Sequence, residues 1–172
     1  MRLPRLRPLL ASTAVALATV CGAPSVASAD TWPVPPAADV TRDVSTMTGD
    51  ELEAALMVGI NDARAKHGLR AIRVFDACTD RLAESWGDRI ARTGRFVHRD
   101  QGEVIRKCDN AWAGETLVRG TGLTPDVMVR LWLDSPSHRE ILLSPRARRA
   151  GVAITQDAQG RTIGVVNLVR QG

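Results

Sequence analysis

The stretch Trp132-Leu133-Asp134-Ser135-Pro136-Ser137-His138-Arg139 contains a helix start and a histidine. A hydroxyl residue before proline is typical of such a start, because proline suits the first helical position and the hydroxyl oxygen accepts backbone N–H groups. Ser135-Pro136 therefore predicts a short helix through about Leu143, with Ser135 as its cap. A nucleophilic role for Ser135 beside His138 is the alternative, but no Gly-x-Ser-x-Gly motif accompanies this serine.

Three more helices are predicted upstream from local signals. Thr124-Pro125 repeats the cap-and-proline pattern, and the helix it opens has an apolar face of Val127, Met128, Leu131 and Trp132, with Trp132 in the core. Thr48 and Glu51 form a capping box before apolar residues at helical spacing, Leu52, Leu56, Ile60 and Ala63, and Gly68 is the expected stop. A helix over 76–93 should end at Gly94 and bury a stripe of Cys78, Leu82, Trp86 and Ile90.

The remaining segments are less regular or rich in β-branched residues. Residues 95–110 are polar and are predicted to be irregular, and 111–118 favours a strand or extended segment that carries Glu115. Residues 151–155 and 162–169 flank a turn at 157–160, which predicts an antiparallel hairpin. Helices precede strands, so the fold class is α+β.

The N-terminus is predicted to be a cleaved signal peptide over residues 1–29. Arg2, Arg5 and Arg7 precede an apolar run that ends at Ala27-Ser28-Ala29. We expect a Pro-rich flexible tether over 30–47 and one domain over 48–172, with no transmembrane segment after cleavage. Cleavage would lower the count of Lys and Arg from 23 to 20 against 19 acids. A net charge so close to zero argues against a nucleic-acid partner.

Cleavage would also remove Cys21 and leave Cys78 and Cys108. Two cysteines in an exported chain most simply form one disulfide, and two free buried thiols are the alternative.

Five short motifs, taken in order, resemble those of the CAP superfamily, in particular its bacterial extracellular branch. They are Asn61 with Arg64, Gly68 and Leu69; Gly94-Arg95-Phe96-Val97-His98; Ala113-Gly114-Glu115; Trp132 with Ser135-Pro136-Ser137-His138-Arg139; and Gly151-Val152. The resemblance covers about Leu52 to Val169.

This resemblance implies an α-β-α sandwich with a small antiparallel sheet and an open central cleft. His98, Glu115 and His138 would converge in the cleft, with Ser135 at its border, and the family includes metal, sterol, lipid and peptide binders but few established enzymes. Thr116 stands where the family usually has asparagine, and Ser135 stands where many eukaryotic members have a second glutamate. Without the resemblance, the histidines would be read as solvated or core residues and Glu115 as a buried carboxylate bonded to backbone or to a histidine.

These residues lead us to expect a secreted, monomeric and non-enzymatic binding module. Two imidazoles and a carboxylate suit a divalent metal such as Zn²⁺, so His98, His138 and Glu115 are the predicted ligands. Otherwise the cleft would take a small ligand, a lipid or a cell-envelope component. The alternatives are a metal-assisted extracellular hydrolase with Glu115 as general base, and a scaffold that acts through its surface. His67, beside the helix stop at Gly68, is expected to be structural.

Overall fold

Five strands form one mixed sheet in the order β1-β2-β4-β5-β3. The computed structural model describes residues 30–36 and 43–172, so the predicted signal peptide lies outside the described residues. The strands are β1 (Thr31–Pro33), β2 (Val74–Asp76), β3 (Asn110–Gly120), β4 (Arg149–Gln156) and β5 (Thr162–Gln171). β2 pairs with β4 in parallel, and every other neighbouring pair is antiparallel. The sheet is therefore mixed, whereas an antiparallel sheet was predicted.

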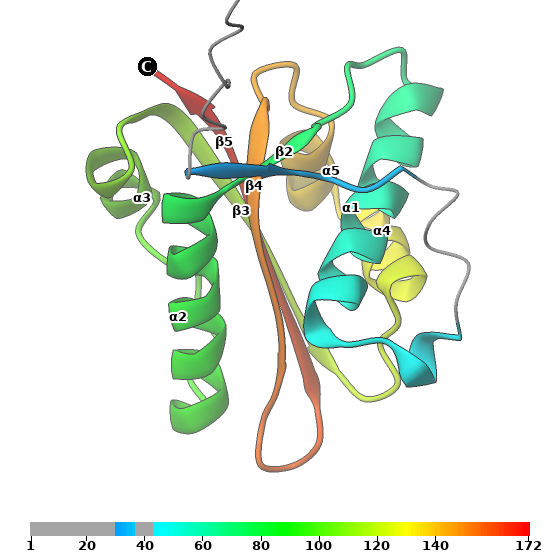
Figure 1. Ribbon diagram of the computed structural model, residues 1–172. Coiled ribbons are helices and arrows are strands. Elements are labelled where there is room, and N and C mark those ends of the chain that lie inside the picture. The colour runs from blue at the N-terminus through cyan, green and yellow to red at the C-terminus, as the bar shows by residue number, and fades with distance from the viewer. Residues whose placement is uncertain (1–29, 37–42) are drawn as a thin grey trace, which may run out of the picture.

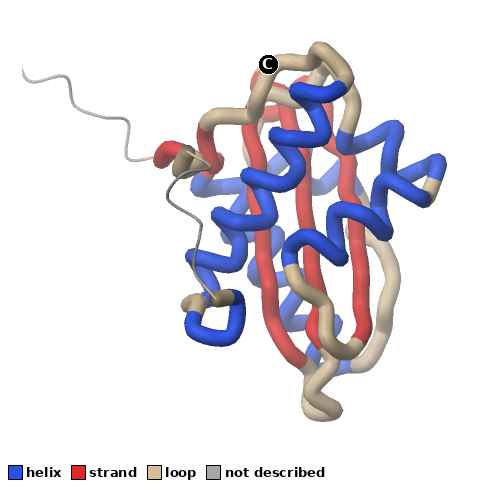
Figure 2. The backbone as a smooth tube through the Cα atoms, turned by 90° about the vertical axis from the view of Figure 1, so that its right-hand side faces the viewer, coloured by secondary structure: helices blue, strands red, loops and turns tan. Residues whose placement is uncertain are grey.

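Helices cover both faces of this sheet, as Figure 1 shows. α2 (Ala77–Thr93) and α3 (Gln101–Lys107) lie on one side, and α1 (Gly49–Lys66), α4 (Pro125–Asp134) and α5 (Pro136–Leu142) lie on the other. Figure 2 looks onto the three-helix side. This arrangement is the predicted α-β-α sandwich. Among the described residues, no helix has both the length and the apolar content needed to cross a bilayer.

The predicted helix boundaries are confirmed where capping residues are strong. Thr48 and Glu51 form the expected capping box at α1, and Thr124 accepts the Val127 N–H at α4. Gly94 ends α2 in the left-handed conformation with φ 70°, which favours glycine. These signals are local, so they act in the same way whatever packs around the helix.

Two predicted irregular regions contain regular structure. Residues 101–107 form α3, which begins where Asp100 accepts the Gly102 N–H and buries only Val104. Within the predicted tether, Thr31–Pro33 pairs with Val74–Asp76, and the Trp32 ring stacks on Phe75 at 5.5 Å. A proline is tolerated there because β1 is an edge strand.

The core has two parts, one on each face of the sheet. On the α1–α4 side it includes Leu56, Ile60, Met128 and Trp132, and Trp132 is buried as predicted. On the α2 side it includes Ala83, Ile90, Leu117, Ile163 and Val165. The predicted buried stripe of α2 is correct only at Ile90, because Cys78, Leu82 and Trp86 are half-buried. The buried face of α2 consists of Thr79, Asp80, Ala83, Gly87 and Ile90.

Two carboxylates complete the outer edge of β4. β2 pairs with β4 only at Phe75 and Ala150. Further along β4, the N–H groups of Val152 and Ile154 point away from β5 and have no strand partner among the described strands. Asp80 accepts the Val152 N–H at 2.9 Å, and Glu53 accepts the Ile154 N–H at 3.0 Å. Burial raises the pKa of Glu53 to about 8 and that of Asp80 to about 6.

We expect Glu53→Gln to flatten the pH dependence of stability. Because the folded state holds the Glu53 proton more tightly than the unfolded chain does, this group stabilises most at low pH and its contribution is lost as pH rises through about 8. Glutamine can still accept the Ile154 N–H but does not titrate. The Tm of the parent should fall from about pH 5 to pH 8 more steeply than that of the variant.

Glu84→Gln is the matched control, because Glu84 is exposed and faces the same carboxylates from α2. The pH profile of this control should stay close to that of the parent. Parallel profiles for the parent and Glu53→Gln would contradict the burial of a titrating carboxylate at Glu53.

Candidate functional site

A cleft of about 910 Å³ lies along the free edge of β3, between α3 and α5. β3 pairs only with β5, so its other edge borders the cleft. Apolar and charged groups are mixed in the lining, which consists of His67, His98, Gln101, Trp112, Ala113, Gly114, Glu115, Pro136, Arg139, Glu140, Ile141, Leu143, Ser144, Pro145 and Arg146. The site is therefore assembled from the end of α1, the loop before α3, the first half of β3, and α5.

Glu115 is buried at 3% exposure and holds the segment that carries His98. Its Oε1 lies 2.9 Å from His98 Nδ1 and accepts the backbone N–H of Arg99 at 3.0 Å. Glu115 is therefore a buried carboxylate that is bonded to both a backbone N–H and a histidine ring. Burial raises the pKa of Glu115, while the bonds from Arg99 and His98 act in the opposite direction.

His138 lies on α5 and its ring lies beside that of His98, although His138 is not among the residues that line the cleft. The two ring centroids are 6.0 Å apart with an interplanar angle of 52°. α5 approaches β3 closely because residue 114 is glycine: a Cβ there would lie 3.0 Å from Ile141 Cγ2. Burial lowers the pKa of His138, and the neighbouring His98 lowers it further, so His138 favours the neutral form that can ligate a metal.

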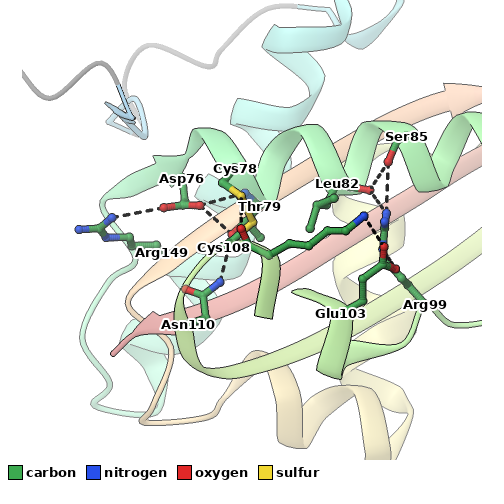
Figure 3. The surroundings of a disulfide bond; sticks show 11 residues. Asp76, Cys78, Thr79, Leu82, Ser85, Arg99, Glu103, Cys108, Asn110 and Arg149 are labelled. Carbon is green, nitrogen blue, oxygen red and sulfur yellow. Dashed lines mark hydrogen bonds and ion pairs between the residues drawn. A yellow bond between two sulfur atoms is a disulfide. The ribbon is translucent and has the colours of Figure 1, made fainter. Parts of the chain in front are cut away.

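Arg99 anchors the His98 segment to α2. Its guanidinium donates to the Leu82 carbonyl at 2.8 Å and to Ser85 Oγ at 3.2 Å, and its Nε donates to Glu103 at 2.9 Å (Figure 3). The hydrogen bond from Arg99 is the largest cause that lowers the pKa of Glu103, to about 2. A buried and bonded arginine beside His98 therefore fixes one wall of the cleft.

The predicted disulfide ties the same wall together. Cys78 of α2 and Cys108 at the end of α3 form a bond with a sequence separation of 30, and Figure 3 shows it beside the Arg99 network. The disulfide joins the C-terminal end of α3 to α2. At the N-terminal end of α3, Glu103 binds Arg99, which in turn binds α2 at Leu82 and Ser85.

The role predicted for the Ser135 side chain is wrong in one respect. Ser135 is the N-cap residue of α5 and its backbone carbonyl accepts the Arg139 N–H, but its hydroxyl makes no capping bond. The hydroxyl instead lies 3.4 Å from Ser137 Oγ. Pro136 has no N–H to be satisfied and suits the first helical position, so α5 begins here without a side-chain cap.

The polar groups around Glu115 are incompletely paired among the described residues. Glu115 Oε2, the Thr116 hydroxyl and the Asn167 amide are buried without a hydrogen-bond partner there. Asn167 lies directly across from Glu115 in the register of β5 and β3. An amide therefore borders Glu115 from the neighbouring strand, although Thr116 has replaced the family asparagine.

The separation of the two imidazole rings is compatible with one shared divalent ion. With Zn–N bonds of about 2.0–2.1 Å, two imidazoles that share one ion have ring centroids about 5–6.5 Å apart, and the observed 6.0 Å lies in that range. In the described part of the chain, no three His, Cys, Asp or Glu side chains are grouped to hold a metal ion. Glu115 is engaged with His98 Nδ1, which leaves Nε2 of His98 as the free ring nitrogen.

The sequence did not predict four residues of the site: Arg99, Gln101, Trp112 and Asn167. None belongs to a short chemical motif, and their roles depend on which strands and loops meet. Only the position of Arg99 beside His98 in the sequence offered a signal. His67, interpreted as structural, also lines the cleft.

This combination of a mixed sheet, helices on both faces and a histidine-lined cleft at the sheet edge defines a CAP-like α+β protein. The chain belongs to the CAP family, described as the cysteine-rich secretory protein family, whose model matches residues 59–168. No curated protein matches the chain significantly.

Solved bacterial structures share the fold at low sequence identity. An outer surface protein from Borrelia burgdorferi has a TM-score of 0.61 at 21% identity, and the match covers 68% of this chain and 90% of that one. An extracellular SCP-domain protein from Bacillus anthracis has a TM-score of 0.57 at 20% identity, covering 73% and 44% of the two chains. A cysteine-rich secretory protein from Staphylococcus aureus has a TM-score of 0.62 at 12% identity, covering 73% and 40%. This chain therefore spans less than half of the last two proteins.

Proposed function

We propose that this protein is a secreted, non-enzymatic binding module that holds a divalent metal between His98 and His138. The 6.0 Å separation of the two rings is the observation that carries the proposal. The occupied cleft would then present the metal to a small ligand, a lipid or a cell-envelope component. Secretion is supported by the signal-like residues 1–29, by the disulfide, and by two structural relatives that are described as extracellular and secretory proteins.

In this proposal Glu115 is not a third metal ligand. It accepts a hydrogen bond from the His98 ring nitrogen that does not bind the metal. A metal-bound histidine commonly donates its other ring N–H to a carboxylate, which fixes the tautomer and raises the basicity of the ligand. The 2.9 Å contact between Glu115 Oε1 and His98 Nδ1 has this arrangement. The bound metal would supply a Lewis-acidic centre with positions left for water or ligand.

Binding is favoured over hydrolysis because Glu115 is poorly placed as a general base. One carboxylate oxygen is engaged with His98 and Arg99, and the other is inaccessible to solvent. A general base must reach the proton of a bound water or substrate.

We expect calorimetric titration with Zn²⁺ to give one-site binding that the double variant His98→Ala/His138→Ala loses. Glu115→Gln should retain binding at roughly 10–100-fold lower affinity, because it weakens the support of His98 without removing a ligand. His67→Ala is the matched control, since it removes the third histidine of the chain from the same cleft lining. Equal heats from the parent and the double variant would contradict the proposal.

A further inference from the structure

Two exposed apolar side chains lie side by side in the sequence at the end of α2. Phe96 is 38% exposed and Val97 is 49% exposed, both in the loop between α2 and α3. Among the described residues, the other exposed large hydrophobic side chains are separate in the sequence: Trp32, Val44 and Leu131. Solvent exposure of two adjacent apolar residues costs free energy unless a partner covers them.

Four arginines either lie near this pair in the sequence or contact the side chains next to it. The Arg119 guanidinium lies 4.8 Å from the centre of the Phe96 ring and donates to the Gly94 carbonyl at 3.0 Å. The Trp86 indole donates to the Val97 carbonyl at 3.0 Å and carries the Arg89 guanidinium 5.1 Å above its ring. Arg92 and Arg95 lie on either side of Thr93-Gly94 in the sequence and are exposed. We call this set the Phe96 patch: Arg89, Arg92, Arg95, Phe96, Val97 and Arg119.

The positive charge of the Phe96 patch is nearly uncompensated. In the described part of the chain, only Arg92 of the four arginines is in an ion pair, with Asp88 at 3.8 Å. Both side chains of that pair are mostly exposed, at 70% and 60%, so the pairing is weak. Four guanidinium groups against one carboxylate leave an excess of three positive charges beside two exposed apolar side chains.

We propose that the Phe96 patch docks onto the surface of an anionic lipid bilayer. Phe96 and Val97 would enter the interface, and the arginines would meet lipid phosphates. A bilayer interface accepts apolar and cationic side chains together, and each basic residue near an anionic surface adds to the attraction. A soluble polyanion would use the arginines and leave Phe96 and Val97 in water, so it accounts for only half of the surface.

Docking at this patch would bring the cleft to the bilayer, because His98 follows Val97 directly in the chain. Gly94 ends α2, so the apolar pair follows directly after the C-terminal end of this helix, which is the end that lies away from α3 in Figure 1. The proposal does not depend on metal binding by the two histidines.

Vesicle co-sedimentation with the purified protein tests this inference. Binding to vesicles of equal parts phosphatidylglycerol and phosphatidylcholine should be at least tenfold stronger than binding to phosphatidylcholine alone, and should weaken with salt. Phe96→Ser/Val97→Ser and, separately, Arg92→Glu/Arg95→Glu should each lower the partition coefficient at least tenfold. Arg130→Glu/Leu131→Ser on α4 is the matched control, since Leu131 is 45% exposed beside an exposed arginine, and it should bind like the parent.

Polyphosphate binding and Zn²⁺ calorimetry on the same variants separate the other outcomes. If the arginine variant loses both vesicles and polyphosphate while Phe96→Ser/Val97→Ser keeps both, the surface binds polyanions and the bilayer proposal is wrong. Equal binding to the two kinds of vesicle also overturns it. Unchanged thermal unfolding of the patch variants would show that these variants are folded, and their Zn²⁺ heats then test the metal proposal separately.

Discussion

Gly151→Ala is expected to destabilise the protein by about 3 kcal/mol or more. Gly151 lies in β4 directly under the first turn of α2, and a Cβ at this position would lie 2.5 Å from the Thr79 oxygen and the Asp80 nitrogen. These are backbone atoms, so relief requires the whole end of α2 to move away from the sheet. That movement would also stretch the adjacent bond between Asp80 and the Val152 N–H. Urea unfolding followed by circular dichroism measures the loss.

Gly164→Ala on β5 is the control for this prediction. A Cβ there would lie 2.8 Å from the sulfur of Met128 and 3.1 Å from Val118 Cγ1, which are side-chain atoms that can shift without moving the backbone. We expect a loss of about 1–2 kcal/mol. A larger loss at Gly164 than at Gly151 would show that the close contact between α2 and β4 is not rigid.

The second large effect is expected at Arg64, a fully buried arginine of α1. Its Nη1 donates to the Leu142 carbonyl at 2.6 Å and to the Ser144 carbonyl at 3.0 Å, and its Nε donates to the Arg70 carbonyl at 2.9 Å. Arg64→Ala should cost about 3–5 kcal/mol, because it leaves buried carbonyls unpaired and opens a cavity. Arg64→Met fills most of the space and should recover part of the loss.

This prediction also concerns the cleft, because Leu142 and Ser144 lie at the end of α5. A seven-residue helix is not stable by itself, so α5 depends on the contacts that hold its end. Hydrogen exchange at the α5 amides should accelerate in Arg64→Met. Arg130→Met, at an exposed arginine of α4, is the control, with a change in stability of about 0.5 kcal/mol or less. Undisturbed α5 exchange in Arg64→Met would contradict the anchoring role.

The sequence was sufficient to predict helices whose ends are marked by local capping residues. Thr48 with Glu51, Thr124 with Pro125, and Gly94 mark helix ends through bonds within a few residues. α3 was missed because it has only seven residues and one buried side chain, which leaves no periodicity to detect. β1 was missed because it is defined by pairing with β2, and nothing in Trp32-Pro33 signals that partner.

For the site, the sequence alone supplied the residue types but not their distances. His98 and His138 were placed together only through the family resemblance, since no spacing rule relates a loop to a distant short helix. The bond between Glu115 and the Arg99 N–H depends on how the loop before α3 crosses β3, which is a tertiary property. Arg64 was noted as part of a motif, but its carbonyl partners around α5 became visible only in the folded chain.

The carboxylates at the outer edge of β4 also bear on self-association. An open strand edge is a template on which another chain can add a strand, and proteins often block it with inward-pointing charged side chains. Here the Val152 and Ile154 amides are already bonded to acids from two different helices, so an incoming strand would have to displace both. We therefore expect this part of β4 to resist pairing with another chain as long as α1 and α2 stay docked on the sheet.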